Sequence, residues 1–331
     1  MAAPLEDCCG LGCNNCILDR HLDNAVRRPD FSGLFNLFNQ KSYQNFRLVA
    51  IEKEREWIYK FKFELVCDRL ELFKPDEQLI ATPVSYLMLR APRVFNGELN
   101  PIFSDFKDFL VHPDGDPDDQ QYFRLEPQRY DKGTPEIYFS RKYTPYEVNE
   151  QLRTFKIIVK LEPYGKMSKF LTQLKIGAVC EFKGPFEAFN YIHESIENYV
   201  VITQGISIVA AFRLVKEIVY ESAQTRVLVI SCFKNINETF LREDFFKMSH
   251  VWCAKHHTFL SQNDVTPEIP QRFGEKIHNE RLNSCNFREL IKEMKHYQPE
   301  NTQVLISGRD SFIDFAQSVV DDSQFKQVNV I

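Results

Sequence analysis

The feature that most constrains the fold is the alternation of strand-like and helix-like segments through the second half of the chain. Short apolar runs typical of buried strands alternate with longer runs of helical period. The strand candidates are 199–203, 226–232, 251–260, 303–308 and 327–331, and the helix candidates are 207–222, 238–248, 286–297 and 310–320. Such alternation predicts a parallel sheet with helices on both faces. We therefore expect a doubly wound, five-stranded parallel domain over residues 191–331.

The first half has a different pattern, in which apolar and polar residues alternate with the period of half-buried strands. The strand candidates are 46–54, 56–65, 83–90, 136–145, 155–163 and 178–186. Six strands with few helices predict a small antiparallel β-barrel. We place this barrel at residues 46–190, with an insertion at about 92–135 that contains the acidic, turn-rich loop "HPDGDPDDQQ".

The composition excludes several classes of protein. A net charge of −5 over 331 residues does not indicate a nucleic-acid binder. No apolar run reaches the roughly 18 residues of a membrane span, and the start "MAAPLEDCCG" lacks the pattern of a signal peptide. Nine cysteines in such a chain favour a reducing compartment. We expect a soluble, cytoplasmic protein, with the surface of the endoplasmic reticulum or of mitochondria as alternative locations.

Four of the cysteines, Cys8, Cys9, Cys13 and Cys16, lie close together in "EDCCGLGCNNC". Thiolates in a C-x-x-C pair can bind one soft metal ion, but no second C-x-x-C follows at zinc-finger spacing. We favour a flexible tail with reduced thiols and predict no metal ligand. A zinc or iron–sulfur site and a redox pair are the alternatives. Residues 1–45 are interpreted as this tail and a linker.

The first candidate binding motif is Arg141, Lys142, Tyr143, Thr144 and Pro145, which ends a strand candidate. Arg141 and Tyr143 are two apart, so in an extended segment their side chains point the same way. A guanidinium group matches phosphate oxygens, and a phenol ring packs against a flat heterocycle. The alternative is a surface strand with a solvated arginine and a packed tyrosine.

The second motif is Gly165, Lys166, Met167 and Ser168, at the predicted start of a helix. We expect Ser168 to be the N-cap and Gly177 to follow the end of the helix. The amides and the partial positive charge of a helix N-terminus suit a pyrophosphate. A plain capped helix is the alternative.

Two more motifs follow strand candidates of the second half. "VITQGISIV" contains Gly205 and Ser207, and "VLISGRDSF" contains Ser307 and Gly308. His256 and His257 lie within a strand candidate, where they would point to opposite faces, so we predict packing roles for both.

In this order the four motifs resemble those of NADH-cytochrome b5 reductase-like proteins, in the ferredoxin reductase superfamily, over residues 46–331. The resemblance implies FAD as cofactor, NADH as co-substrate, and a one-electron acceptor such as the haem of cytochrome b5. It implies binding of these cofactors by Arg141, Lys142, Tyr143, Thr144, Ile158, Lys160, Tyr164, Gly165, Lys166, Met167, Ser168, Gly205, Ser207 and Gly308. It also implies that Thr144 and Ser307 lie beside the reacting rings. The cysteine-rich start resembles an "oxidoreductase-like" N-terminal motif.

The chain departs from this family pattern at several positions. Ile202 and Thr203 replace two glycines, so we expect their side chains to narrow the approach to a nucleotide. Ser307 stands where relatives have a cysteine, and Arg309 where they have a proline. Lys234 and Asn237 are polar candidates near an adenosine. These departures leave two interpretations open, an NADH reductase and a degenerate relative with a binding or assembly role.

Overall fold

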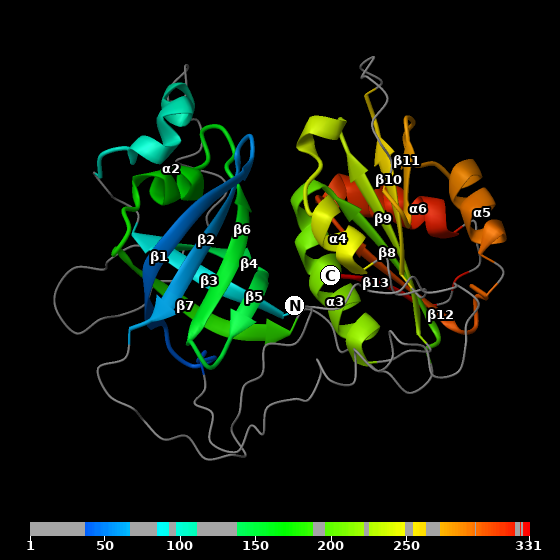
Figure 1. Ribbon diagram of the computed structural model, residues 1–331, viewed down its shortest axis with the longest axis horizontal. Helices are drawn as coiled ribbons and strands as arrows, with labels where there is room; N and C mark the ends of the chain where they lie inside the picture. Colours follow the sequence, from blue (N-terminus) through cyan, green and yellow to red (C-terminus); the bar gives the residue numbers. More distant parts are fainter. Residues whose placement is uncertain are drawn as a thin grey trace, which may run out of the picture.

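The computed structural model places the protein in two packed parts, a curled antiparallel sheet and a parallel sheet covered by helices (Figure 1). It describes residues 37–66, 85–92, 97–110, 138–187, 196–221, 225–248, 254–262, 272–294, 296–321, 325 and 327–331. The four clustered N-terminal cysteines and the acidic loop of the insertion lie outside these residues. No helix in the described part of the chain is long and apolar enough to cross a membrane.

The antiparallel sheet has seven strands in the order β4-β3-β7-β1-β2-β6-β5. Their bounds are β1 Gln44–Arg55, β2 Ile58–Leu65, β3 Ser85–Pro92, β4 Tyr138–Tyr143, β5 Pro145–Asn149, β6 Thr154–Lys160 and β7 Val179–Glu187. Strands β4 and β5 stand at opposite ends of this order, yet only Thr144 separates them in the chain. The sheet must therefore curl until its two ends meet, which confirms the predicted barrel.

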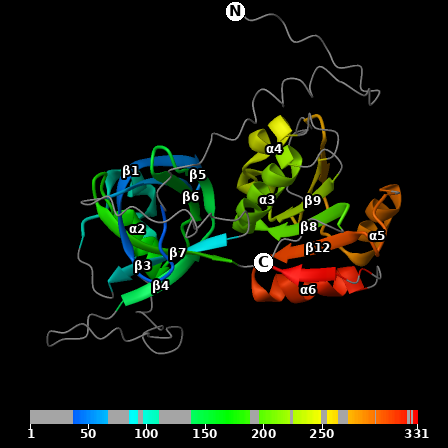
Figure 2. The same cartoon turned by 90° about the horizontal axis from the view of Figure 1, so that it is seen from below.

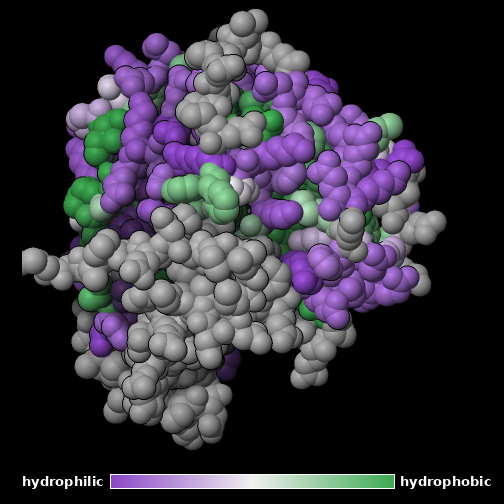
Figure 3. Space-filling model, turned by 45° about the vertical axis from the view of Figure 1, so that its right-hand side comes forward, coloured by the Kyte–Doolittle hydropathy of each residue, from purple (hydrophilic) through white to green (hydrophobic). Residues whose placement is uncertain are grey.

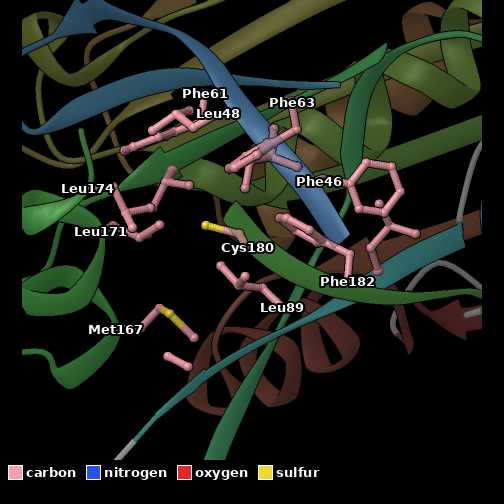
Figure 4. Packing of buried hydrophobic residues seen from close by; sticks show 14 of the residues in the cluster. Phe46, Leu48, Phe61, Phe63, Leu89, Met167, Leu171, Leu174, Cys180 and Phe182 are labelled. Atoms are coloured by element: carbon pink, nitrogen blue, oxygen red, sulfur yellow. The ribbon is translucent and has the colours of Figure 1, made fainter. Parts of the chain in front are cut away.

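The interior of the barrel is built largely from phenylalanine. Phe46, Phe61, Phe63, Phe155 and Phe182 are at most 1% exposed, and several of these rings meet edge to face at about 5 Å between centroids. Figure 4 shows this cluster with the side chains of helix α2 (Lys166–Gln173) reaching it from one side. The period of two along β2 places alternate side chains inside, as the sequence pattern predicts.

The barrel core also contains residues that we had assigned to the tail. Leu37 and Phe38 are each 3% exposed, and the Phe38 ring packs edge-on against Phe155 at 5.3 Å. The predicted boundary at residue 45 is therefore wrong. Two apolar residues in a polar, asparagine-rich stretch show no strand or helix period, so their burial depends on contacts made far along the chain.

This correction sets the extent of a deletion that the protein should tolerate. Removing residues 1–36 should leave the fold and the rate of flavin reduction about the same, because no buried residue of the described barrel is lost. Removing residues 1–40 also deletes Leu37 and Phe38. Because both side chains are buried in the barrel core, this truncation should lower the melting temperature by several degrees. Thermal unfolding and single-turnover reduction of both truncations test this. A large loss of rate in the shorter truncation, with FAD retained, would contradict it.

The parallel sheet has six strands in the order β11-β10-β9-β8-β12-β13. Their bounds are β8 Asn198–Gln204, β9 Arg226–Phe233, β10 Ala254–Leu260, β11 Glu275–His278, β12 Thr302–Ser307 and β13 Gln327–Val330. The predicted doubly wound class is confirmed, with one strand more than expected. Strand β11 was missed because "EKIH" is short and polar, without the apolar run of its neighbours.

Helices cover both faces of this sheet (Figure 2). One face packs on α3 (Ile208–Glu221) and α4 (Arg242–Met248), and the other on α5 (Ser284–Glu293) and α6 (Asp310–Asp321). Short 3-10 turns follow two strands, η3 (Gly205–Ser207) after β8 and η4 (Ile236–Glu238) after β9. A longer one, η2 (Pro101–Phe109), belongs to the insertion and packs on the barrel.

The two parts share a packed interface. Ile58 and Ile158 of the barrel belong to the same apolar cluster as the side chains of α3 and α4. Tyr146 of β5 stacks on Phe212 of α3 with 5.2 Å between centroids, and its hydroxyl donates to Asp244 of α4 at 3.0 Å. On the outer face shown in Figure 3, hydrophobic residues are scattered among hydrophilic ones.

Both histidines of β10 are buried and pack against neighbouring rings, in agreement with the predicted packing roles. His256 Nε2 lies 2.8 Å from the Ser231 hydroxyl, and the His256 ring stacks on Phe245 of α4 at 4.6 Å. His257 Nδ1 lies 3.0 Å from Nε2 of His278 on β11. Within the described ranges, no group of three side chains is placed to bind a metal ion.

Candidate functional site

The first motif lies on β4 and at the start of β5, and strand alternation divides its side chains between two faces. Arg141 and Tyr143 share the face of the buried Phe139, whereas Lys142 lies on the other face with its Nζ 4.6 Å from the centre of the Tyr86 ring. The predicted pairing of Arg141 with Tyr143 is thus found. The side chain of Lys142 does not join them.

The environments of Arg141 and Tyr143 differ. Arg141 is exposed, and its Nη1 donates to the carbonyl oxygen of Ser140 at 2.9 Å. Burial raises the pKa of the Tyr143 hydroxyl above its ordinary value, with the charge of Arg141 acting in the opposite direction. The phenol is therefore neutral at physiological pH and able to donate a hydrogen bond, beside a permanent cation.

The register of the barrel directs this motif toward the start of α2. Pro145 of β5 pairs with Ile157 of antiparallel β6, and β4 also contacts β6. Because the two strands run in opposite directions, the chain before Pro145, which leads back to Arg141, lies toward the same end of the barrel as Lys160 at the end of β6. Six residues after Lys160, helix α2 begins. The two predicted motifs thus approach the same end of the barrel.

The start of α2 corrects one prediction. The N-cap is Gly165, with no side-chain cap, and Ser168 lies inside the first turn. The Ser168 hydroxyl instead accepts a hydrogen bond from the Glu162 amide at 2.9 Å, which ties the loop before the helix to its first turn. Sequence preference alone favoured serine over glycine at the cap.

This glycine leaves the backbone of the turn accessible. A Cβ at Gly165 would lie 3.1 Å from both the Glu162 carbonyl oxygen and Ser168 Oγ, so a side chain would crowd the turn. The first amides of a helix have no acceptor within the helix and point outward. Met167 is 6% exposed and points into the barrel core (Figure 4), so only its amide faces the turn.

The other predicted cofactor-binding residues on the barrel differ in how accessible their side chains are to a ligand. Tyr164 is 40% exposed, and its amide donates to the Phe109 carbonyl oxygen at 2.9 Å. Lys160 forms an ion pair of 3.5 Å with Glu238 of η4. Ile158 is 4% exposed within the interface cluster, so its side chain is not available to a ligand.

On the parallel sheet, the loops after β8 and β12 are joined. Ser207 Oγ donates to the Ser307 carbonyl oxygen at 2.7 Å. Gly205 has a φ of +56°, which favours glycine, and a Cβ at Gly308 would lie 2.6 Å from the Phe312 ring. Gly205, Ser207 and Gly308 therefore lie at the ends of two adjacent strands.

The expected crowding by Ile202 and Thr203 is wrong. Both residues lie inside β8 and are 0% exposed, with Ile202 in the core beneath α5 and α6. The turn itself starts only at Gln204, so these two side chains do not narrow the approach to it. Glycine at either position would remove buried contacts from the sheet and would not open a binding surface.

Ser307, which the resemblance places beside a reacting ring as it does Thr144, is 7% exposed, and its hydroxyl donates to the carbonyl oxygen of Ile331 at 2.8 Å. The next loop residue but one, Arg309, reaches the barrel, where its Nη2 donates to Glu162 Oε1 at 3.3 Å. Sequence reasoning missed Glu162, because no motif indicates a partner 147 positions away in the chain.

The residues at the end of the barrel fit FAD. The Arg141 guanidinium and the outward amides of α2 are donors suited to a pyrophosphate, and the crowding that a Cβ would cause at Gly165 agrees with a backbone cradle. The neutral phenol of Tyr143 offers a flat ring beside Thr144.

Comparison with known proteins agrees with this geometry. The family model described as an oxidoreductase FAD-binding domain matches residues 130–191, which contain both barrel motifs. A human protein named NADH-cytochrome b5 reductase-like is 22% identical over 322 residues, covering 93% of this chain and 85% of the relative. The mouse protein of the same name is 25% identical, covering 93% and 86%.

Solved structures show the same fold. The cytochrome b5 reductase domain of Ulva prolifera nitrate reductase superposes with a TM-score of 0.61 at 17% identity, covering 90% of this chain and all of that one. The CS-b5R domains of human Ncb5or, in an NAD+ form, give a TM-score of 0.59 at 13% identity, covering 87% and 69%.

Proposed function

We propose that the protein is an FAD-dependent NADH reductase that passes electrons to a one-electron acceptor such as a cytochrome b5-type haem protein. The observation that supports this proposal is the register of the barrel, which directs Arg141 and the N-terminus of α2 toward the same end. The FAD-binding family model covers this same stretch, and the relatives that match over most of the chain are named as NADH-cytochrome b5 reductase-like proteins.

The barrel residues would hold the flavin. Arg141 and the first amides of α2 bind the pyrophosphate, and Gly165 permits its close approach. Tyr143 packs against the flat part of the cofactor, and Thr144 offers a hydroxyl and an amide beside it. A bound flavin can take two electrons from NADH as a hydride and release them one at a time, which is the chemistry that a haem acceptor requires.

The loops of the parallel sheet would orient the nicotinamide nucleotide. Gly205 and Ser207 follow β8, and Ser307 and Gly308 follow β12, so both loops lie at the carboxyl ends of adjacent parallel strands. Ligands of doubly wound sheets bind at this position. Ser307 would act through its placement beside the ring, once its hydroxyl leaves the Ile331 carbonyl.

A second function is favoured by a specific observation. The Ser307 hydroxyl is engaged by Ile331, and the pair of Arg309 with Glu162 joins the two loops between which a nicotinamide would enter. A protein that keeps this arrangement would retain FAD as a structural element and serve as a binding or assembly partner.

Electron transfer to an acceptor separates the two functions. The FAD-loaded protein should reduce both ferricyanide and a cytochrome b5-type protein at the expense of NADH, with two acceptors reduced per NADH. Retention of FAD without reduction of either acceptor would favour the binding role. If the protein does not retain FAD, neither the reductase function nor the binding role with a structural FAD is supported.

A further inference from the structure

A row of hydroxyl side chains crosses the parallel sheet near the carboxyl ends of its strands. The row has one residue per strand, in register, and consists of Thr258 of β10, Ser231 of β9, Thr203 of β8 and Ser307 of β12. The first three are 0% exposed, and Ser307 is 7% exposed. Strands of a covered parallel sheet are usually continuous apolar runs, so a buried polar row must find its hydrogen bonds within the protein or from a ligand.

One hydroxyl of this row lacks a partner in the structure. The Ser231 and Thr258 hydroxyls lie 3.2 Å apart, and Ser307 Oγ donates to the Ile331 carbonyl oxygen at 2.8 Å. Thr203 Oγ1 is buried and, among the residues that the structure describes, has no hydrogen-bond partner. An unpaired buried hydroxyl costs free energy that a valine of the same shape would not. A second arrangement of the site, in which Thr203 is paired, would recover this cost.

The Ser307 hydroxyl can reach either neighbouring strand. Strand β12 lies between β8 and β13, with Thr203 in register on one side. On the other side is Ile331, whose amide donates to the Ile306 carbonyl oxygen at 2.9 Å. Paired strands are about 4.8 Å apart, so a change of rotamer at Ser307 turns its hydroxyl from Ile331 toward Thr203. The backbone need not move, because Ser207 Oγ holds the Ser307 carbonyl oxygen at 2.7 Å.

This change of rotamer alters what Ser307 offers to a ligand. A serine hydroxyl has one hydrogen to donate and two lone pairs to accept with. In the structure that hydrogen is used by the Ile331 carbonyl. If Thr203 donates to Ser307 Oγ, the Ser307 hydrogen is free for an acceptor at the end of the sheet. Ile331 is only partly buried, so its carbonyl oxygen can accept from water instead.

We propose that Thr203 is a positioning residue, which donates to Ser307 Oγ when a ligand binds and so directs the Ser307 hydroxyl toward the carboxamide oxygen of a nicotinamide ring. The contact with Ile331 is the resting arrangement, and the contact with Thr203 is the bound one. Thr203 is fully buried, so it acts through Ser307 and does not touch the ligand. The identity of the ligand rests on the proposed reductase function, whereas the exchange of partners rests on the row of hydroxyls.

Calorimetric titration of the full chain, saturated with FAD, tests this without any redox step. The two probes are NAD+ and ADP-ribose, which lacks the nicotinamide ring. Thr203→Val should weaken NAD+ binding by about three- to tenfold and change ADP-ribose binding by less than about twofold. Thr203→Ser should keep the affinity for NAD+. The matched control is Thr258→Val, which removes a hydroxyl of the same row two strands away and should bind both probes as the wild type does.

Two further measurements separate positioning from a structural effect. Thr203→Val should melt at the wild-type temperature or higher, because the hydroxyl that it removes is unpaired in the resting protein. Ser307→Ala should weaken NAD+ binding to a similar extent, and adding Thr203→Val to it should cause no further loss, because Thr203 acts through Ser307. Equal weakening of NAD+ and ADP-ribose, or the same loss with and without the Ser307 hydroxyl, would overturn the proposal.

The outcome for Thr203 is distinct from the outcome for the reductase function. Flavin reduction by NADH with an unchanged NAD+ affinity in Thr203→Val would overturn the exchange of partners and leave the reductase in place. An NAD+ affinity that depends on Thr203, without reduction of the flavin by NADH, would support the exchange and count against the reductase. No detectable binding of NAD+ to the wild type would overturn the exchange whether or not the flavin is reduced.

Discussion

Replacing Arg141 by alanine should weaken FAD binding by roughly ten- to a hundredfold. The guanidinium is placed to make charge-assisted hydrogen bonds with phosphate oxygens, and losing such bonds costs about 1.5–3 kcal/mol. Fold stability should change little, because the Arg141 side chain is exposed on β4. Flavin content after dialysis against a competing apo-flavoprotein measures the effect.

Lys142→Ala is a matched control for this experiment. It removes the neighbouring cation, which lies on the opposite face of β4 above the Tyr86 ring. The two variants lose the same charge, so long-range electrostatics change equally, and only Arg141→Ala should release FAD. Equal loss of FAD from both variants would show that the face of the strand is irrelevant and that the proposed contact is absent.

Acidification to about pH 5 should destabilise the fold strongly through the histidines of β10. Burial lowers the pKa of His256 from its ordinary value to about 4, with Glu275 opposing the shift, and burial with the nearby charge of His278 lowers the pKa of His257 to about 3. Below about pH 6.5 the unfolded chain binds protons that the native state excludes. This contribution to stability is therefore complete above pH 6.5 and is lost as the pH falls toward 4, about 2 kcal/mol per histidine at pH 5.

Urea unfolding at about pH 7.5 and pH 5 measures this loss, and a single substitution assigns it. His256→Gln keeps a polar group near Ser231 but cannot titrate, so its unfolding free energy should fall by about 2 kcal/mol less between the two pH values than that of the wild type. The exposed His296→Gln should behave as the wild type. An identical pH dependence in His256→Gln would assign the acid sensitivity to other groups.

The sequence was most informative where one physical signal dominated. The apolar runs at β8, β9 and β12 could only be buried strands between amphipathic helices, and the alternation in β2 and β6 indicated a half-buried antiparallel sheet. These signals predicted both halves of the fold. They failed at β11, a four-residue strand with a single apolar residue, which is held by pairing with β10 and by the ion pair of Arg242 with Glu275.

The sequence indicated which types of residue form the candidate site, but it did not predict how their side chains and backbone are arranged. Strand period paired Arg141 with Tyr143, whereas the resemblance grouped Lys142 with them, and the structure places Lys142 on the other face of β4. The N-cap at Gly165 and the hydrogen bond from Glu162 to Ser168 depend on how the loop closes, which no local preference encodes. The expected crowding by Ile202 and Thr203 failed because motif alignment does not show burial, and both side chains lie buried inside β8, which continues through Gln204.

The contacts between the barrel and the parallel-sheet domain could not be predicted from the sequence. Two ion pairs, Lys160 with Glu238 and Arg309 with Glu162, join positions far apart in the chain. Lysine, arginine and glutamate are common on protein surfaces, and no nearby sequence feature sets these four residues apart. Their roles follow only from the loops that they bring together.

Anaerobic mixing of the FAD-loaded protein with NADH in a stopped-flow spectrometer tests the central claim most directly. If the protein is an NADH reductase, the oxidised-flavin absorbance should be lost rapidly and stoichiometrically, with a rate that saturates as NADH increases, and should recover when a one-electron acceptor is added. A flavin that stays oxidised with either NADH or NADPH, in protein that demonstrably retains FAD, would contradict the reductase function and leave the binding role in its place.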